Sequence, residues 1–115
     1  MSQRNLTRVE FRREGGFAGI PLTAELDAGS LPPDEAAALR ELLDSADFFS
    51  LPAVIVPPRA GADQFQYVIT VEADGQRHTV RTTDPAPPAL HKLLDFLMRI
   101  TKGKSERQRL RYGRK

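Results

Sequence analysis

Apolar and polar residues alternate twice near the start of the chain, as they do in a β-strand that buries one of its faces. Over residues 6–13, Val9 and Phe11 alternate with charged residues, and the same period returns over residues 20–27. The segment between them, residues 15–19, contains three glycines, which suit a turn that needs a positive φ. The pattern therefore predicts a β-hairpin with a glycine-rich turn.

A second hairpin gives the clearest pattern in the sequence. Apolar residues occupy every second position over residues 65–71, and the alternation returns over residues 77–83. Asp74 and Gly75 lie between the two runs, and an Asp-Gly pair is a strong signal for a type I′ turn. We therefore predict two antiparallel strands joined by a tight turn.

Each hairpin is followed by an amphipathic helix. The first helix begins after Pro32, has acidic residues in its first turn and ends near Ser45. The second ends near Lys102 and Lys104, whose charges favour the C-terminal end of a helix dipole. The apolar stripes, with helical spacing, are Leu39, Leu42, Leu43 and Ala46 in the first helix, and Leu90, Leu93, Leu94, Leu97 and Met98 in the second.

The order of these elements, ββα-ββα, predicts the class of the fold. An antiparallel sheet of about four strands with both helices on one face buries every apolar stripe at once, so we expect a small α+β domain. A proline-rich connection, residues 51–63, links the two halves and holds one short extended segment over residues 53–56. We expect the domain to span residues 1–101 and a basic, disordered tail to follow over residues 102–115.

Composition excludes several kinds of protein. The chain has 115 residues, enough for one domain with a modest core, and 40% of them are hydrophobic. It has no cysteine, which rules out disulfides, thiolate-bound metals and cysteine nucleophiles. It also lacks an apolar run of signal-peptide or membrane-spanning length. We therefore expect a cytoplasmic protein that makes no contact with membranes. Our working expectation for its oligomeric state, which composition does not specify, is a monomer.

The net charge of +2 hides an uneven distribution. Residues 102–115 hold seven basic side chains and a single acid, so this tail carries a net charge of +6. Residues 1–101 carry a net charge of −4, so the body is mildly acidic although the isoelectric point is about 9.3. Any binding of nucleic acid is therefore expected to use the tail.

Few residues suggest catalysis. His78 is in register with the apolar side of its strand, and His91 lies four residues before Asp95 on the second helix. The spacing of His91 and Asp95 allows joint metal binding, but no third ligand is visible nearby, so a surface hydrogen bond or ion pair is favoured. The chain has no Gly-x-Ser-x-Gly elbow and no phosphate-binding loop with its lysine. We therefore predict a non-enzymatic protein without a metal or cofactor.

The first hairpin is the best candidate for a binding site. Its turn places Phe17 among glycines, and Glu25 and Asp27 lie on the polar face of the second strand. Two interpretations are open: Phe17 folds back onto the core from a plain turn, or it projects as an apolar anchor. An apolar anchor beside a carboxylate is what a small inhibitor offers to a protease cleft.

Residues 9–20, VEFRREGGFAGI, resemble the opening hairpin of the emfourin family, with the double glycine as the most specific part. The likeness spans residues 6–100 and does not extend to the basic tail. Further similar segments are residues 39–43, 48–52, 63–71, Gly75, residues 78–80 and the leucine-rich last helix. Emfourins are small cytoplasmic bacterial proteins that inhibit protealysin-like metalloproteases, which are related to thermolysin.

The resemblance implies a non-enzymatic inhibitor that blocks the access of substrate to the protease active site. Such enzymes hold a zinc ion with two histidines and a glutamate, and leave a fourth position open for water. A carboxylate of the inhibitor can displace that water while an apolar side chain fills the specificity pocket. Glu25 is the first candidate for this carboxylate, because it lies near the glycine turn and faces away from the apolar row, and Asp27 is the second. The other candidate contacts with the protease are Phe17, Gly15, Gly16 and Ile20.

The alternative hypothesis is a nucleic-acid- or partner-binding module that acts through the basic tail. Its candidate contacts with phosphate are Arg107, Arg109, Arg111 and Arg114. Deletion of residues 103–115 separates the two hypotheses, since it spares inhibition under the first and abolishes binding under the second.

Overall fold

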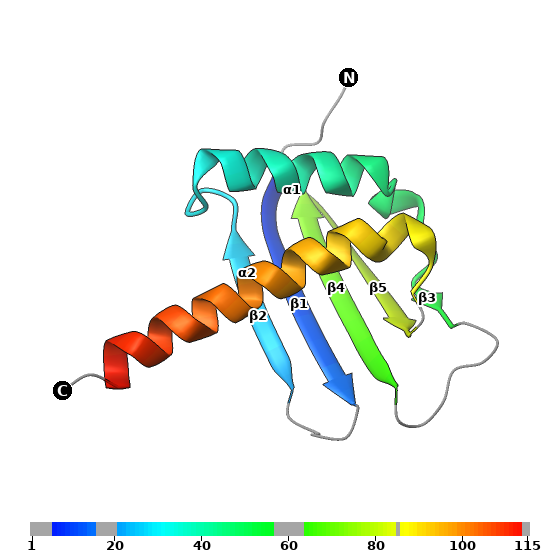
Figure 1. The fold of residues 1–115 in the computed structure, drawn as a ribbon. Helices are drawn as coiled ribbons and strands as arrows, with labels where there is room; N and C mark the ends of the chain where they lie inside the picture. The colour runs from blue at the N-terminus through cyan, green and yellow to red at the C-terminus, as the bar shows by residue number, and fades with distance from the viewer. Residues whose placement is uncertain (1–5, 16–20, 57–63, 85, 114–115) are drawn as a thin grey trace.

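The computed structural model describes residues 6–15, 21–56, 64–84 and 86–113, with the backbone alone described over residues 103–113. Two long helices lie over one five-stranded sheet (Figure 1). The strand order in the sheet is β2-β1-β4-β5-β3, so the two hairpins lie side by side. In chain order the elements are β1 (Leu6–Gly15), β2 (Leu22–Asp27), α1 (Pro33–Ser45), the short 3₁₀ helix η1 (Phe48–Ser50), β3 (Val54–Ile55), β4 (Phe65–Ala73), β5 (Gln76–Thr83) and α2 (Pro88–Gly113).

Both predicted hairpins are confirmed. β1 pairs with β2 in antiparallel fashion, and β4 pairs with β5 in the same way. The turn between β4 and β5 has a positive φ at both central residues, 51° at Asp74 and 76° at Gly75. Positive φ at both positions characterises the type I′ turn that Asp-Gly favours, so this turn follows directly from the sequence.

The sheet has one strand more than the predicted four. β3 is parallel to β5 and pairs with Arg81 and Thr82. The carbonyl of Ala53 accepts a hydrogen bond of 2.8 Å from the N–H of Arg81, which anchors the segment. The element order is therefore ββα-βββα. A strand of two residues is too short to show alternation, so the sequence indicates only an extended segment here.

Both helices cover the same face of the sheet, as predicted (Figure 1). On the sheet side of the core, Val9, Phe11 and Ile69 are at most 2% exposed. On the helix side, Leu39 and Leu97 are fully buried. The remaining core residues are Leu6, Leu26, Leu43, Ala46, Phe48, Val71, Ala73, Val80, Ala86, Leu90, Leu93, Leu94 and Phe96.

The first helix ends where the sequence predicts and the last helix does not. α1 ends at Ser45, whereas α2 continues to Gly113 through the segment predicted to be a disordered tail. Most of residues 104–111 are good helix formers, and one internal glycine costs a helix only about 1 kcal/mol, so Gly103 does not end α2. Among the described residues, no helix combines the length and the apolar character needed to cross a membrane.

Candidate functional site

The turn of the first hairpin follows Gly15, a position at which the surrounding backbone leaves no room for a side chain. Gly15, the last residue of β1, has a φ of +90° and pairs with Phe65 at the start of β4. A Cβ atom on Gly15 would lie 2.8 Å from the carbonyl oxygen of Gln64, closer than van der Waals contact allows. The end of β1, where the hairpin turn begins, therefore lies directly against the backbone that leads into β4.

Aromatic rings support the same end of the sheet. The guanidinium carbon of Arg13 lies 4.1 Å from the centre of the Phe65 ring, within cation–π range. The ring of Tyr67 stacks on that of Phe11 with centroids 6.3 Å apart. The Tyr67 hydroxyl also donates a hydrogen bond of 3.3 Å to the carboxylate of Asp84. These contacts stabilise β1 and β4 at the end of the sheet where the turn of the first hairpin begins.

The Tyr67 hydroxyl releases its proton less readily than an ordinary tyrosine. Burial raises the pKa of Tyr67 from 10.0 to about 12, and the negative charge of Asp84 adds to this effect. Because the folded-state pKa exceeds the unfolded-state value, the folded protein holds this proton more tightly. The resulting stabilisation is complete below pH 10 and is lost as the pH rises toward 12.

Tyr67→Phe is therefore expected to flatten the alkaline end of the stability curve. The phenylalanine keeps the ring on Phe11 but has no proton to lose. Between pH 10 and 12 the free energy of unfolding of the parent should fall more steeply than that of the variant. Urea denaturation of both proteins from neutral pH upward measures this difference. Parallel curves above pH 10 would show that the Tyr67 proton is not linked to folding.

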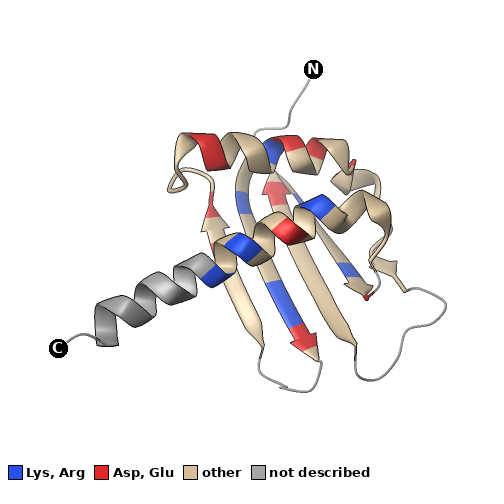
Figure 2. Cartoon of the chain, viewed as in Figure 1, with Lys and Arg blue, Asp and Glu red and all other residues tan. Residues whose placement is uncertain are grey.

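The face of the sheet away from the helices is polar and carries both candidate carboxylates. Leu26 is 2% exposed in the core, and its neighbours on β2, Glu25 and Asp27, are exposed on the opposite face, as predicted. Figure 2 shows basic and acidic positions on several strands of the same sheet. No helix in the described part of the chain lies over this open face (Figure 1).

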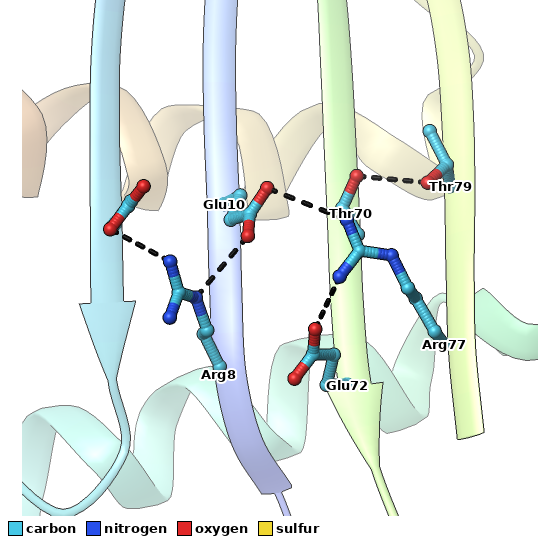
Figure 3. Close-up of polar contacts among 7 residues, drawn as sticks. Arg8, Glu10, Thr70, Glu72, Arg77 and Thr79 are labelled. Carbon is cyan, nitrogen blue, oxygen red and sulfur yellow. Dashed lines mark hydrogen bonds and ion pairs between the residues drawn. The ribbon is translucent and has the colours of Figure 1, made fainter. Parts of the chain in front are cut away.

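Ion pairs connect four strands across this open face. Nη2 of Arg8 lies 2.7 Å from Oε1 of Glu25, and Nε of the same guanidinium lies 3.2 Å from Oε2 of Glu10. Arg77 on β5 pairs with Glu72 on β4, and its Nη2 lies 3.8 Å from Oε1 of Glu10. Figure 3 shows Arg8, Glu10, Glu72 and Arg77 in this row. Exposed ion pairs contribute only about 0–1 kcal/mol each, so the row orients side chains more than it stabilises the fold.

Glu25 and Asp27 occupy different positions relative to the hairpin turn. At about 3.4 Å per residue, Glu25 lies roughly 10 Å along β2 from Leu22 and Asp27 lies roughly 17 Å from it. Oδ1 of Asp27 accepts a hydrogen bond of 3.2 Å from the N–H of Gly29, which shapes the turn after β2. Glu25 is therefore nearer to the glycine turn, and Asp27 has a structural contact of its own.

Sequence reasoning missed Arg8, Glu10, Glu72 and Arg77 as parts of the site. Their contacts depend on the register between neighbouring strands, and period-two alternation does not specify register. One signal was nevertheless present: the charges on residues 8–14 alternate in sign at every second position. Such a row on one face of a central strand indicates cross-strand ion pairs.

The two histidines bond to backbone carbonyls. Nε2 of His78 lies 2.8 Å from the oxygen of Leu51, and Nε2 of His91 lies 2.7 Å from that of Ala86. His91 thus forms a hydrogen bond, as the favoured interpretation holds, but with Ala86 in place of Asp95. In the part of the chain that the structure describes, no three His, Asp or Glu side chains are grouped as metal ligands.

Several predicted site residues lie outside the described part of the structure. These are Gly16, Phe17, Ile20 and Arg114, together with the side chains of Arg107, Arg109 and Arg111. Their proposed contacts with a protease or with phosphate stay predictions, as does the end of the domain at residue 101.

The fold is a compact α+β domain, with two helices over a mostly antiparallel sheet of five strands. A family model described as Emfourin matches residues 11–98, well over half of the chain. The chain belongs to the emfourin family, whose members are non-enzymatic inhibitors of protealysin-like metalloproteases. The resemblance seen in the sequence is thereby confirmed. Comparison with the curated proteins and with the solved structures gives no match.

Proposed function

We propose that the chain inhibits a protealysin-like metalloprotease by filling its active-site cleft with the first hairpin, with the carboxylate of Glu25 directed at the catalytic zinc. The exposure of Glu25 carries this proposal. Its side chain is 71% exposed, against 34% for Glu10 and 33% for Glu72 on the same face. Of these three acids, Glu25 has the greatest access to a partner.

The place of Glu25 on the sheet also favours contact with a partner. β2 is one of the two edge strands, and no described strand flanks its outer side. A partner can therefore approach Glu25 from the edge as well as from the open face. A catalytic zinc keeps one position for water, and a carboxylate oxygen is a common zinc ligand. A carboxylate in that position removes the water that the protease uses as its nucleophile.

The turn of the hairpin supplies the apolar contacts in this proposal. Phe17 and Ile20 are the large apolar residues of the segment between β1 and β2, and in this proposal they fill the specificity pocket of the protease. Gly15 and Gly16 are the further candidate contacts. The inhibitor and the substrate then need the same pocket and the same metal. Inhibition is therefore expected to be competitive with substrate.

Glu25→Gln tests the role of the carboxylate. Glutamine keeps the size of the side chain but loses the charge, so the inhibition constant should rise by at least about tenfold, or about 1.4 kcal/mol. The measurement is the residual activity of a thermolysin-like protease on a peptide substrate at increasing inhibitor concentration. Asp27→Asn is the matched control, because asparagine keeps an oxygen for the N–H of Gly29. It should change the inhibition constant by a factor of about five at most.

The pattern of results identifies which carboxylate acts, if either does. Loss of inhibition in Asp27→Asn alone would transfer the role to Asp27. Full inhibition by both Glu25→Gln and Asp27→Asn would show that the carboxylate mechanism is wrong, even where the parent protein inhibits.

A further inference from the structure

The second half of α2 continues beyond the body of the protein. Its first half is anchored in the core, where Leu90, Leu93 and Leu97 are at most 1% exposed. The hydroxyl of Thr101, which is buried too, donates a hydrogen bond of 2.6 Å to the carbonyl of Leu97. The helix then runs on to Gly113, past the edge of the sheet that β2 forms (Figure 1). Its last turns are therefore held out by a helix whose orientation the core fixes.

These last turns, residues 102–113, are strongly basic. One of the twelve residues, Glu106, is acidic and five are basic, which gives a net charge of +4 over a length of about 18 Å. Residues 1–101 carry a net charge of −4 and repel a polyanion. A polyanion that binds the chain is therefore expected to contact the last turns of α2.

Helical geometry distributes the five bases over two opposite sides of α2. At about 100° per residue, Lys104, Arg107 and Arg111 occupy positions within about 60° of one another. Lys102 and Arg109 occupy positions on the opposite side of the helix. A flat anionic surface, such as a membrane, contacts only one side of a helix. Bases on two sides are suited to a partner that has negative charge on both flanks of the helix.

The residues between the two basic sides differ in kind. Ser105, Gln108 and Tyr112, which are neutral and can form hydrogen bonds, occupy one of the intervening sides. Glu106, the one acid, shares the other intervening side with Leu110. A helix in the major groove of DNA has phosphates on both flanks and base edges in front of it. The order of residue types around α2 matches these surroundings, with the acid on the side away from the bases.

We propose that residues 102–113 of α2 bind in the major groove of duplex DNA, with the lysines and arginines on the two sides of the helix contacting the two phosphate backbones. The major groove of B-form DNA is about 12 Å wide and admits an α-helix, whereas that of duplex RNA is too narrow for side chains to read. This activity is independent of inhibition, which is expected to need none of residues 103–115.

Binding of a short fluorescent DNA duplex to the full chain, followed by anisotropy between about 50 and 200 mM salt, measures the phosphate contacts. Each contact contributes about −0.9 to the slope of log K against log salt, so five contacts predict a slope of about −4.5. Deletion of residues 103–115 should abolish this binding. A slope near zero, or equal binding by the shortened chain, would overturn the proposal.

Two double variants test whether both sides of the helix contact phosphate. Lys104→Gln with Arg111→Gln removes two charges from one side, and Lys102→Gln with Arg109→Gln removes two from the other. Each pair should make the slope less steep by about 1.8. An effect confined to one pair would show that the helix lies on a surface and not in a groove.

A control for net charge comes from the open face of the sheet, where Arg12 and Arg81 are exposed. Arg12→Gln with Arg81→Gln lowers the charge of the chain by the same amount and should leave the slope unchanged. If this pair changes the slope as much as the helix pairs do, total charge and not the position of the bases determines binding.

A proline within the last turns separates a bound helix from a basic chain of any conformation. Gln108→Pro keeps every charge but breaks the helix between its bases, so affinity for the duplex should fall at least about tenfold. Gln108→Ala, which keeps the helix, should bind close to the parent. Equal affinities of the two variants would overturn the groove-bound helix.

Vesicles that contain anionic lipids test the other large partner that a basic helix can bind. The proposal predicts that the duplex binds at salt concentrations where such vesicles do not. Binding to the vesicles without binding to the duplex would overturn it. The inhibition of a thermolysin-like protease, measured on the same variants, should stay unchanged throughout, so failure of this proposal is distinguishable from failure of the proposed function.

Discussion

Phe11→Ala is expected to lower the free energy of unfolding by about 3–5 kcal/mol. Phe11 is 2% exposed on β1, between Ala24 of β2 and Ile69 of β4, and its ring stacks on that of Tyr67. Truncation removes the free energy of burying the ring and leaves a cavity beneath the helices. Small domains have only about 5–15 kcal/mol of stability in total, so the variant should be close to unfolding.

Phe65→Ala is the control for this change. Phe65 is a half-buried ring on the same face at the start of β4, so its loss should cost about 1–2 kcal/mol. Urea denaturation followed by circular dichroism measures both variants. Equal losses of stability would contradict the central place of Phe11 in the core.

Gly15→Ala is expected to cost about 2–4 kcal/mol, from two separate causes. The φ of +90° at Gly15 is unfavourable for any residue with a Cβ atom, and that atom would lie 2.8 Å from the carbonyl oxygen of Gln64. To relieve the clash, the end of β1 must move away from the backbone of Gln64, and this shifts the start of the hairpin turn. We therefore expect weaker inhibition as well as lower stability.

Gly75→Ala separates the two causes. Gly75 has a φ of +76°, but a Cβ atom there would meet nothing within 4 Å. This variant should show the backbone strain alone, about 1–2 kcal/mol, and leave inhibition unchanged. If both glycine variants lose the same stability, the close approach of Gly15 to Gln64 contributes nothing.

The elements with strong local signals were predictable from the sequence. The Asp74-Gly75 turn and the alternation on either side of it specify the second hairpin. The apolar faces of the four predicted strands and two helices must all be buried, and a single core between sheet and helices buries them together. β3 was not predictable in this way, because a strand of two residues has no pattern of its own. It forms because β5 is beside it and the N–H of Arg81 donates a hydrogen bond to the carbonyl of Ala53. The end of α2 was misjudged because Gly103 was given more weight than the helix formers that follow it.

The candidate site was predictable in its parts but not in its connections. Alternation alone places Glu25 and Asp27 on the polar face of the second strand. The sequence ranks Glu25 first by its distance from the glycine turn, and the structure adds their contacts: Asp27 accepts a hydrogen bond from Gly29, and Glu25 pairs with Arg8 on the next strand. The register that brings Arg8 to Glu25 depends on the length and type of the hairpin turn, which alternation alone does not specify.

The most direct test of the account is the inhibition of a thermolysin-like protease, preferably a protealysin-like one, by the purified full chain at several substrate concentrations. The account predicts loss of activity that added substrate reverses, with the inhibitor recovered uncleaved and with the same inhibition constant after deletion of residues 103–115. Full protease activity at a large excess of the chain, across several such proteases, would contradict it.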